Sequence, residues 1–303
     1  MNNRYAWYGP LGLGLVVIAT SGCDDPLSEV EAIEKTRVVG AKVEVAGDPT
    51  RAAPLPGEEV VVRFLVLAPD PAPAFAYALT ACVAADAATD LTTCAGEPLA
   101  TAASLIPTPD APSITFTAPA EATGDERLAV LGDVCSDGVG LPNEAAASCD
   151  DGSEARATAL DFAMDDGSHP NTNPELVSIE FDGVELLPET GLTTDCAELP
   201  GASGGGIQHR LTVTVSDASR DAVVPENGAD FTRESLLFSY FVSRGDLDHA
   251  WSGLESTEPS NATGALWTAP EVDAPSPARF VVVVRDGRGG SDFTERRVCI
   301  LPR

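Results

Sequence analysis

Six cysteines arranged as three neighbouring pairs constrain the fold of this 303-residue chain more than any other feature. Beyond Cys23, the chain contains Cys82, Cys94, Cys135, Cys149, Cys196 and Cys299. Six cysteines allow many connectivities, and the simplest joins each cysteine to its neighbour in this order. The alternative is a metal site, but the chain has no Cys-x-x-Cys motif and no nearby histidine pair. The spacing therefore predicts structural disulfides, which form in an oxidising compartment.

The seventh cysteine, Cys23, follows an N-terminal segment of distinctive order. Arg4 precedes an apolar run over 11–19, and the small residues 20–22 stand directly before Cys23. The run is far shorter than the roughly 20 residues that span a bilayer, but it fits the hydrophobic region of a secretory signal. This segment resembles a bacterial lipoprotein signal peptide. The resemblance implies that residues 1–22 are removed and that Cys23 is lipidated.

Ordinary cleavage after Ser21 remains an alternative, because residues 19–21 approximate a small-x-small site. In the lipoprotein interpretation, residues 23–37 are the lipidated N-terminus and a short acidic tether. The chain is then expected in the bacterial cell envelope, outside the cytoplasm and lipid-anchored to the outer or inner membrane. Asp24, the residue after the cysteine, leaves the choice of membrane open.

The rest of the chain consists of short segments that alternate in polarity or are rich in β-branched residues, as strands do. Turns containing many of the 27 glycines and 24 prolines separate these segments. One series lies in residues 38–164 and a second in residues 175–303, with a polar linker at 165–174. The Gly- and Ala-rich stretch 196–207 is expected to be a flexible surface loop. The prediction is an all-β chain of two immunoglobulin-like β-sandwich domains.

Three motifs in the second domain resemble PKD-type or cadherin-like sandwiches. They are Val213-Thr-Val-Ser-Asp217, Trp267-Thr-Ala-Pro270 and Val284-Arg-Asp-Gly-Arg-Gly-Gly290. Trp267 is expected to fill the space between the two sheets, and Asp286-Gly287 to form a hairpin turn. The resemblance implies a role in adhesion or spacing at the cell surface.

Acidic turns raise the question of calcium, because cadherin-like domains bind it through acidic loops. Asp217 and Asp221 flank one turn, and Asp286 and Asp292 flank another that is expected at the same end of the domain. Calcium requires six to eight oxygen ligands, and the chain has no EF-hand motif. Acidic turns are also ordinary in a strongly acidic protein. Calcium at these four residues stays an alternative, and no other cofactor is predicted.

The formal net charge of −29 bears on the choice of partners. Phosphate backbones are bound by clustered Lys and Arg, and only two lysines are present, so nucleic acid is not a predicted partner. The predicted partners are the membrane, through the N-terminal lipid, and an unidentified protein or glycan ligand.

No catalytic site is predicted. His169, His209 and His249 are far apart in the sequence. Residues 201–205 match Gly-x-Ser-x-Gly by letter, but they lack the strand-to-helix setting of a nucleophile elbow. The predicted function is a non-enzymatic, membrane-anchored envelope lipoprotein that acts as a surface display, adhesion or binding module. The alternatives are a periplasm-facing accessory subunit of a secretion or envelope complex and, less favoured, a secreted hydrolase that uses Ser203.

Overall fold

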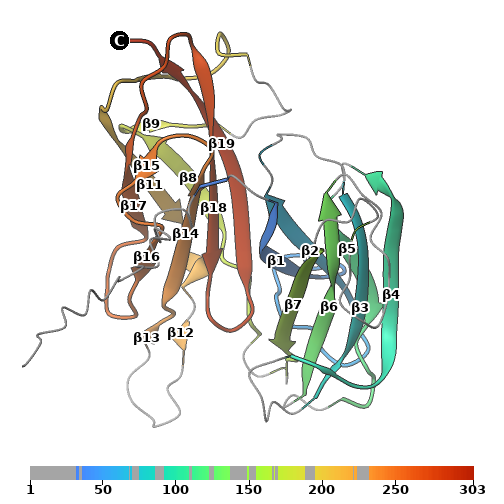
Figure 1. Cartoon of the computed structure of the whole chain (residues 1–303). Helices are drawn as coiled ribbons and strands as arrows, with labels where there is room; N and C mark the ends of the chain where they lie inside the picture. The colour runs from blue at the N-terminus through green and yellow to red at the C-terminus, as the bar shows by residue number, and fades with distance from the viewer. Residues whose placement is uncertain are drawn as a thin grey trace, which may run out of the picture.

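The computed structural model describes residues 32–33, 36–67, 69, 75–85, 92–108, 111–122, 126–136, 149, 155–165, 167, 170–187, 195–220, 222–223 and 232–303. The predicted signal peptide, Cys23, most of the tether, Asp221 and His169 lie outside these residues. Strands dominate the described part of the chain (Figure 1). Its helical content is one 3₁₀ turn, η2 (Asp217–Ser219), and none of its helices is long and apolar enough to cross a membrane.

The first group of strands forms two facing sheets. One contains β1 (Arg37–Val45), β2 (Glu59–Leu67) and β5 (Ser113–Thr117) in the order β1-β2-β5. The other contains β3 (Phe75–Ala84), β4 (Cys94–Thr108), β6 (Arg127–Ser136) and β7 (Arg156–Ala163) in the order β4-β3-β6-β7. In β2 the alternating residues Val60, Val62 and Phe64 are buried, so the period of two in the sequence marks the face that packs on the core.

The second group repeats this arrangement. One sheet contains β8 (Leu176–Phe181), β9 (Val184–Glu185), β11 (Gln208–Val215), β15 (Asp246–Leu247) and β17 (Ala262–Thr268) in the order β15-β17-β11-β8-β9. The facing sheet contains β10 (Gly201–Ser203), β14 (Leu236–Val242), β16 (Trp251–Leu254), β18 (Ser276–Arg285) and β19 (Ser291–Leu301) in the order β10-β19-β18-β14-β16. A small ribbon of β12 (Ala222–Val223) and β13 (Thr232–Arg233) lies apart from them.

Seven strands of each group are connected in the same way. In chain order they are β1 to β7 in the first group, and β8, β11, β14, β16, β17, β18 and β19 in the second. In both groups the first strand pairs with the second and the second with the fifth, while the opposite sheet runs fourth, third, sixth, seventh. This is the strand order of immunoglobulin-like sandwiches, in which the chain passes between the two sheets several times. The predicted all-β, immunoglobulin-like fold class is confirmed.

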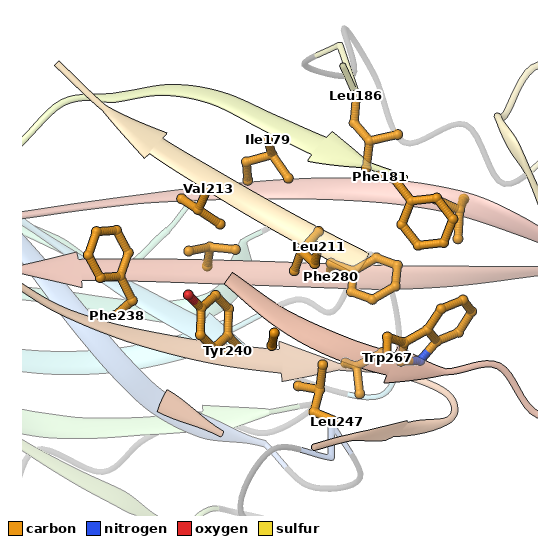
Figure 2. Packing of buried hydrophobic residues seen from close by; sticks show 14 of the residues in the cluster. Ile179, Phe181, Leu186, Leu211, Val213, Phe238, Tyr240, Leu247, Trp267 and Phe280 are labelled. Carbon is orange, nitrogen blue, oxygen red and sulfur yellow. The ribbon is translucent and has the colours of Figure 1, made fainter. Parts of the chain in front are cut away.

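The core of the second sandwich is built around Trp267, which has no exposed surface. Its ring meets the ring of Phe280 from the opposite sheet edge-on, with 5.0 Å between the centroids, and both point into the space between the layers (Figure 2). Tyr240 is equally buried, and its hydroxyl bonds to the Ser252 hydroxyl at 2.6 Å. Trp267 therefore fills the position that the sequence predicted for it.

The prediction of disulfide bonds is confirmed. The bonds are Cys82–Cys94, Cys135–Cys149 and Cys196–Cys299, which is the pairing that the order of the cysteines favours. Three disulfides in one chain indicate an extracytoplasmic location.

The Gly- and Ala-rich stretch that follows Cys196 contains a strand. Residues 201–203 are strand β10, paired in parallel with the end of β19, so the prediction of a flexible loop over 196–207 is wrong there.

The two sandwiches are joined along a seam between β1 and the β18–β19 hairpin, and they stand side by side in Figure 1. Asn173, from the segment expected as a linker, is buried in this seam. Its amide nitrogen donates to the Val43 oxygen at 2.6 Å, and its amide oxygen accepts from the Ser291 nitrogen at 3.0 Å. One side chain thus bonds to both sandwiches, and residues 170–174 act as part of the joint.

A cluster of apolar side chains completes the seam. It contains the buried residues Ile33, Leu67, Phe241, Val281 and Val283. Gly40 allows the close approach of β1, because a Cβ at this position would lie 3.3 Å from a methyl group of Val283. The sandwiches therefore share buried apolar surface and form one body.

We expect the long-range disulfide to contribute more stability than a short one. Replacing Cys196 and Cys299 together by Ala removes a link between residues 103 apart, and replacing Cys82 and Cys94 removes one between residues 12 apart. Loop entropy predicts losses of about 4.7 and about 3 kcal/mol respectively. Urea denaturation of the two double variants measures the free energies of unfolding. Equal losses would contradict a loop-length origin of the stabilisation.

A second prediction concerns Asn173. Asn173→Ala leaves the Val43 oxygen and the Ser291 nitrogen without their partner, and each such buried group costs about 1–3 kcal/mol. We expect a loss of about 2–6 kcal/mol in the free energy of unfolding. Asn261→Ala, at a turn where the side chain bonds to Asp217 and Arg233, is the control and is expected to cost less. Similar costs for both variants would show that the seam does not depend on Asn173.

Candidate functional site

The outer face of β18 points away from the core of the second sandwich and carries buried valines and two arginines. Phe280, Val282 and Val284 point inward, so the alternate residues lie on the outer face. There Val281 and Val283 are covered by the first sandwich, and an arginine stands at each end, Arg279 and Arg285. Arg285 donates to the Val39 oxygen of the first sandwich and to the Ser239 hydroxyl. Arg285 therefore belongs to the seam, whereas Arg279 lines a cavity.

We call this cavity the arginine pocket. Its volume is about 440 Å³, and three of its lining residues are Arg244, Arg279 and Arg297. The other described residues that line it are Ile33, Pro69, Ser243 and Pro277. Arg279 and Arg297 face each other directly across the β18–β19 ladder, and they are only 8% and 3% exposed. Like charges in directly opposed positions repel each other, and burial strengthens that repulsion.

Glu295 lies beside two of these arginines. Glu295 lies two residues before Arg297 on the same face of β19, and it accepts from the Arg297 Nη2 at 2.7 Å and the Nε at 3.1 Å. The Arg279 Nη1 is 3.8 Å from the other Glu295 oxygen. Arg244 is exposed. The pocket thus brings three guanidinium groups together in a chain whose net charge is −29.

The backbone holds the pocket in shape. The Ser243 nitrogen donates to the Arg279 oxygen, and the Arg279 nitrogen donates to the Ser243 hydroxyl, each at 2.9 Å. The N-terminal segment is fixed beside them, because the Ile33 nitrogen donates to the Val242 oxygen at 2.9 Å. The pocket therefore combines three arginines, a hydroxyl group and a wall that contains Ile33.

Two other cavities lie along the seam and are lined by residues of both sandwiches. One, of about 440 Å³, is lined mainly by small residues of β1, β7 and the β18–β19 hairpin, together with Arg285. The other, of about 480 Å³, contains Lys42, whose amine lies 2.9 Å from Asp292 and 4.0 Å from Glu44. Lys42 is therefore paired with two of the three carboxylates that line this cavity, and the third is Glu175.

Asp217 and Asp292, two of the four residues considered for calcium, have other partners in the structure. Asp217 bonds to Arg233 and Asn261, and these contacts lower its pKa. Asp292 bonds to Lys42 and accepts from the Leu176 nitrogen at 3.2 Å. The structure does not bring three His, Cys, Asp or Glu side chains together as a metal site anywhere among the residues it describes.

Asp286 forms the expected hairpin turn between β18 and β19. One carboxylate oxygen accepts from the Arg288 nitrogen at 2.7 Å and from the Gly290 nitrogen at 2.9 Å. The other oxygen is buried without a hydrogen-bond partner. Burial raises the pKa of this carboxyl group in spite of the two main-chain donors. Asp286 therefore shapes the hairpin that the seam depends on.

Ser203, His209 and Asp182 come together in space, but in an arrangement that is typical of structure. His209 Nδ1 lies 2.7 Å from an Asp182 carboxylate oxygen, and Nε2 lies 2.9 Å from the main-chain oxygen of Ser203. A carbonyl oxygen only accepts, so Nε2 donates and is not free to take a proton from the Ser203 hydroxyl. The ring is 6% exposed and stacks on Phe181 at 4.9 Å. This geometry supports a role for His209 in holding β10 against β11.

Sequence reasoning did not single out the arginines of the pocket. Arg244, Arg279 and Arg297 are separated by 35 and 18 residues and belong to no motif. A signal for Arg279 was present, since the run Phe280–Val284 lacks the alternation of a strand with one solvent face. Such a run predicts that both faces of the strand are covered. Residues at its ends, such as Arg279, are then expected to be at least partly buried.

Comparisons with known proteins add little to the geometry. No protein-family model matches the sequence, and no curated protein matches it. Similar solved structures include Salmonella alpha-2-macroglobulin reacted with methylamine (14% identity, TM-score 0.24, 91% of this chain and 16% of that one). Others are dimeric latent PorU from Porphyromonas gingivalis (10%, 0.24, 86% and 24%) and Clostridium thermocellum CbhA fibronectin(III)-like modules (12%, 0.25, 86% and 94%).

This chain thus spans 16% and 24% of the first two matched proteins. At TM-scores of 0.24 to 0.25 these likenesses carry no argument. The fold assignment rests on the strand order described above.

A test of the structural role of His209 follows from Asp182. Partial burial acts to raise the pKa of this carboxyl group, but hydrogen bonds from His209 and the Arg210 nitrogen outweigh it and lower the pKa. A lowered carboxyl pKa stabilises the fold above the unfolded pKa, near 3.9, and this stabilisation is lost as the pH falls through the folded value. Asp182→Asn should therefore lower the free energy of unfolding at pH 7, with a difference from wild type that shrinks below about pH 4.

Asparagine tolerates the positive φ of 51° at this position, so the turn itself is retained. Urea denaturation between pH 7 and pH 3 measures the effect, and Asp273→Asn on an exposed loop is the matched control. A difference that stays constant over this range would show that the carboxylate charge is unimportant.

Proposed function

We propose that this chain is a lipid-anchored, non-enzymatic module of a bacterial cell envelope that holds a rigid body at the membrane surface and presents it for binding. The anchor in this proposal is Cys23, and the binding partner is a protein or glycan outside the cytoplasm. The observation that carries the proposal is the seam, which makes one body of two sandwiches through Asn173 and a shared apolar cluster.

Rigidity is the property that a display or spacing module requires. A flexible linker lets each domain tumble independently, whereas a buried joint fixes the orientation of one domain relative to the other. Here β1 leads directly from the N-terminal segment into the seam, and the disulfide at Cys299 fixes the last strand. Such a body keeps its outer surfaces at a fixed height and orientation above the residue that anchors it.

The geometry around Ser203 supports the non-enzymatic part of the proposal. The nearest histidine bonds to the main-chain oxygen of Ser203 and is stacked among aromatic rings. A hydrolase would need this ring nitrogen to accept the proton of the serine hydroxyl.

Lipidation is tested by labelling cells with radioactive palmitate. We expect the wild type to incorporate the label and Cys23→Ala to lose it, because the thiol is the proposed acceptor. The control is the double variant Cys82→Ala and Cys94→Ala, which removes two cysteines elsewhere and should retain the label. A wild-type protein without label, with a mature N-terminus at Gly22, would show ordinary signal cleavage and refute the anchor.

The display role is tested separately on intact cells. Added protease should digest a surface module, whereas a body that faces the periplasm stays protected. Crosslinking followed by co-purification then distinguishes the accessory subunit, which would carry one protein in fixed ratio. Protection from protease combined with such a partner would replace the display role by that alternative.

A further inference from the structure

We infer that the chain forms a symmetric dimer in which β16 of one copy pairs antiparallel with β16 of a second copy. This strand covers Trp251–Leu254 and is the last strand of its sheet, next to β14 (Figure 1). No described strand pairs with its other side. The inference goes beyond the proposed function and does not depend on lipidation of Cys23.

The main chain of β16 offers a second copy unpaired hydrogen-bonding groups. The Tyr240 nitrogen donates to the Ala250 oxygen at 2.8 Å, so Ala250 turns its main-chain groups toward β14. Hydrogen-bonded pairs alternate along an antiparallel ladder, and Ser252 therefore does the same. The N–H and C=O groups of Trp251 and Gly253 consequently point away from β14, at the free edge of the sheet. Such an edge is a template for pairing with another chain.

The outer face of this edge combines exposed apolar side chains with an open place. Trp251 is 65% exposed, and Leu237 on β14 is 45% exposed. Leu237 lies directly opposite Gly253 in the ladder. A Cβ at Gly253 would meet only the Leu236 oxygen, at 3.5 Å, among the described residues. The sheet surface beside Leu237 is therefore free to receive a large side chain.

Two-fold symmetry determines which residues meet. Strands paired about a two-fold axis keep opposed side chains on one face, so the axis passes through a residue. With the axis at Ser252, Trp251 of each copy lies opposite Gly253 of the other, and both residues turn their N–H and C=O groups to the partner. The indole then covers the glycine and reaches Leu237 beyond it. Aromatic rings opposite edge glycines stabilise sheets in this way.

The surface is continuous with the seam between the sandwiches. Phe241, on the same outer face of β14, belongs to the apolar cluster of the seam. Between Phe241 and Leu237 lies Ser239, whose hydroxyl accepts from the seam residue Arg285 at 3.1 Å. The first sandwich thus covers one end of this face and leaves the other end, with Leu237 and Trp251, exposed. A face that already serves as an interface at one end is suited to a second contact at the other.

A second copy is the occupant because the edge carries both halves of the match, an indole and a glycine, two residues apart. The net charge of −29 opposes self-association. However, none of the four residues of β16 is charged, and at physiological salt charges farther away than about 8 Å are largely screened. The edge is short, so the interface is small and the dimer is expected to dissociate on dilution.

Sedimentation velocity over a range of concentrations measures the dimer, using the full chain with Cys23→Ala, which carries no lipid at that residue. We expect Trp251→Ala to weaken association at least tenfold, because tryptophans at the centre of interfaces contribute much of the binding energy. Gly253→Lys retains the indole but places a charge at the edge, and should also weaken association. Both residues are exposed, so neither change is expected to impair folding. Val184→Ala, at an exposed apolar residue of the edge strand β9, is the matched control and should leave the dimer unchanged.

Ser252→Cys tests the register. With the axis at residue 252, its two copies form a pair without hydrogen bonds, whose Cα atoms are about 4.5 Å apart, a distance that suits a disulfide. We expect a covalent dimer of this variant under mild oxidation. Thr257→Cys, at an exposed position five residues further on, is the control and should not crosslink.

A monomer at all concentrations, or equal association by Trp251→Ala and Val184→Ala, would overturn the inference. So would a dimer that Ser252→Cys does not crosslink. A shift of the Trp251 emission on adding polysaccharide to a chain that stays monomeric would replace the second copy by a glycan. None of these results tests the anchor at Cys23, so failure of the dimer and failure of the proposed function are distinguishable.

Discussion

Val281 and Val283 point away from the core of the second sandwich and are nevertheless buried, because the first sandwich and Ile33 cover them. The rest of the molecule depends on this burial. The sheet that contains β18 is apolar on both faces, so it serves at once as one wall of a core and as the floor of the seam. Fully burying a valine contributes about 1.5–3 kcal/mol, and neither residue gains it unless the two sandwiches stay together. The hydrogen bonds of Asn173 then fix the register of a contact that apolar burial alone would leave free to slide.

The same face explains why charge accumulates where it does. An outer face that is apolar in the middle must end in residues with long polar side chains, and here these are Arg285 at one end and Arg279 at the other. Arg285 finds oxygens of Val39 and Ser239 at the seam and is satisfied there. Arg279 lies opposite Arg297 on β19 and near Glu295. The two ends of this strand face therefore lie in different settings, since Arg285 closes the joint and Arg279 lines an open cavity.

The sequence was sufficient for the fold class, for Trp267 in the core and for the Asp286 hairpin, because each depends on local periodicity or turn chemistry. It was insufficient for β10, where pairing with β19 and the Cys196–Cys299 bond hold a Gly-rich segment that has no strand pattern of its own. The arginine pocket could not be predicted from the sequence for a related reason. Arg279 and Arg297 become neighbours only through the register of a hairpin, and Arg244 joins them through a third strand. The register depends on the whole sheet, so it cannot be predicted from any one segment.

The position of the N-terminal segment decides which part of the body is nearest to the tether. Order along the chain alone would place the first sandwich there, with the second beyond it. Ile33, however, bonds to the end of β14 in the second sandwich before the chain crosses into β1. The seam, and with it the arginine pocket, therefore lies where the tether enters the folded body. In an anchored protein this arrangement holds the joint between the sandwiches near the lipid surface, so the residues that make the body rigid lie on the side of the anchor.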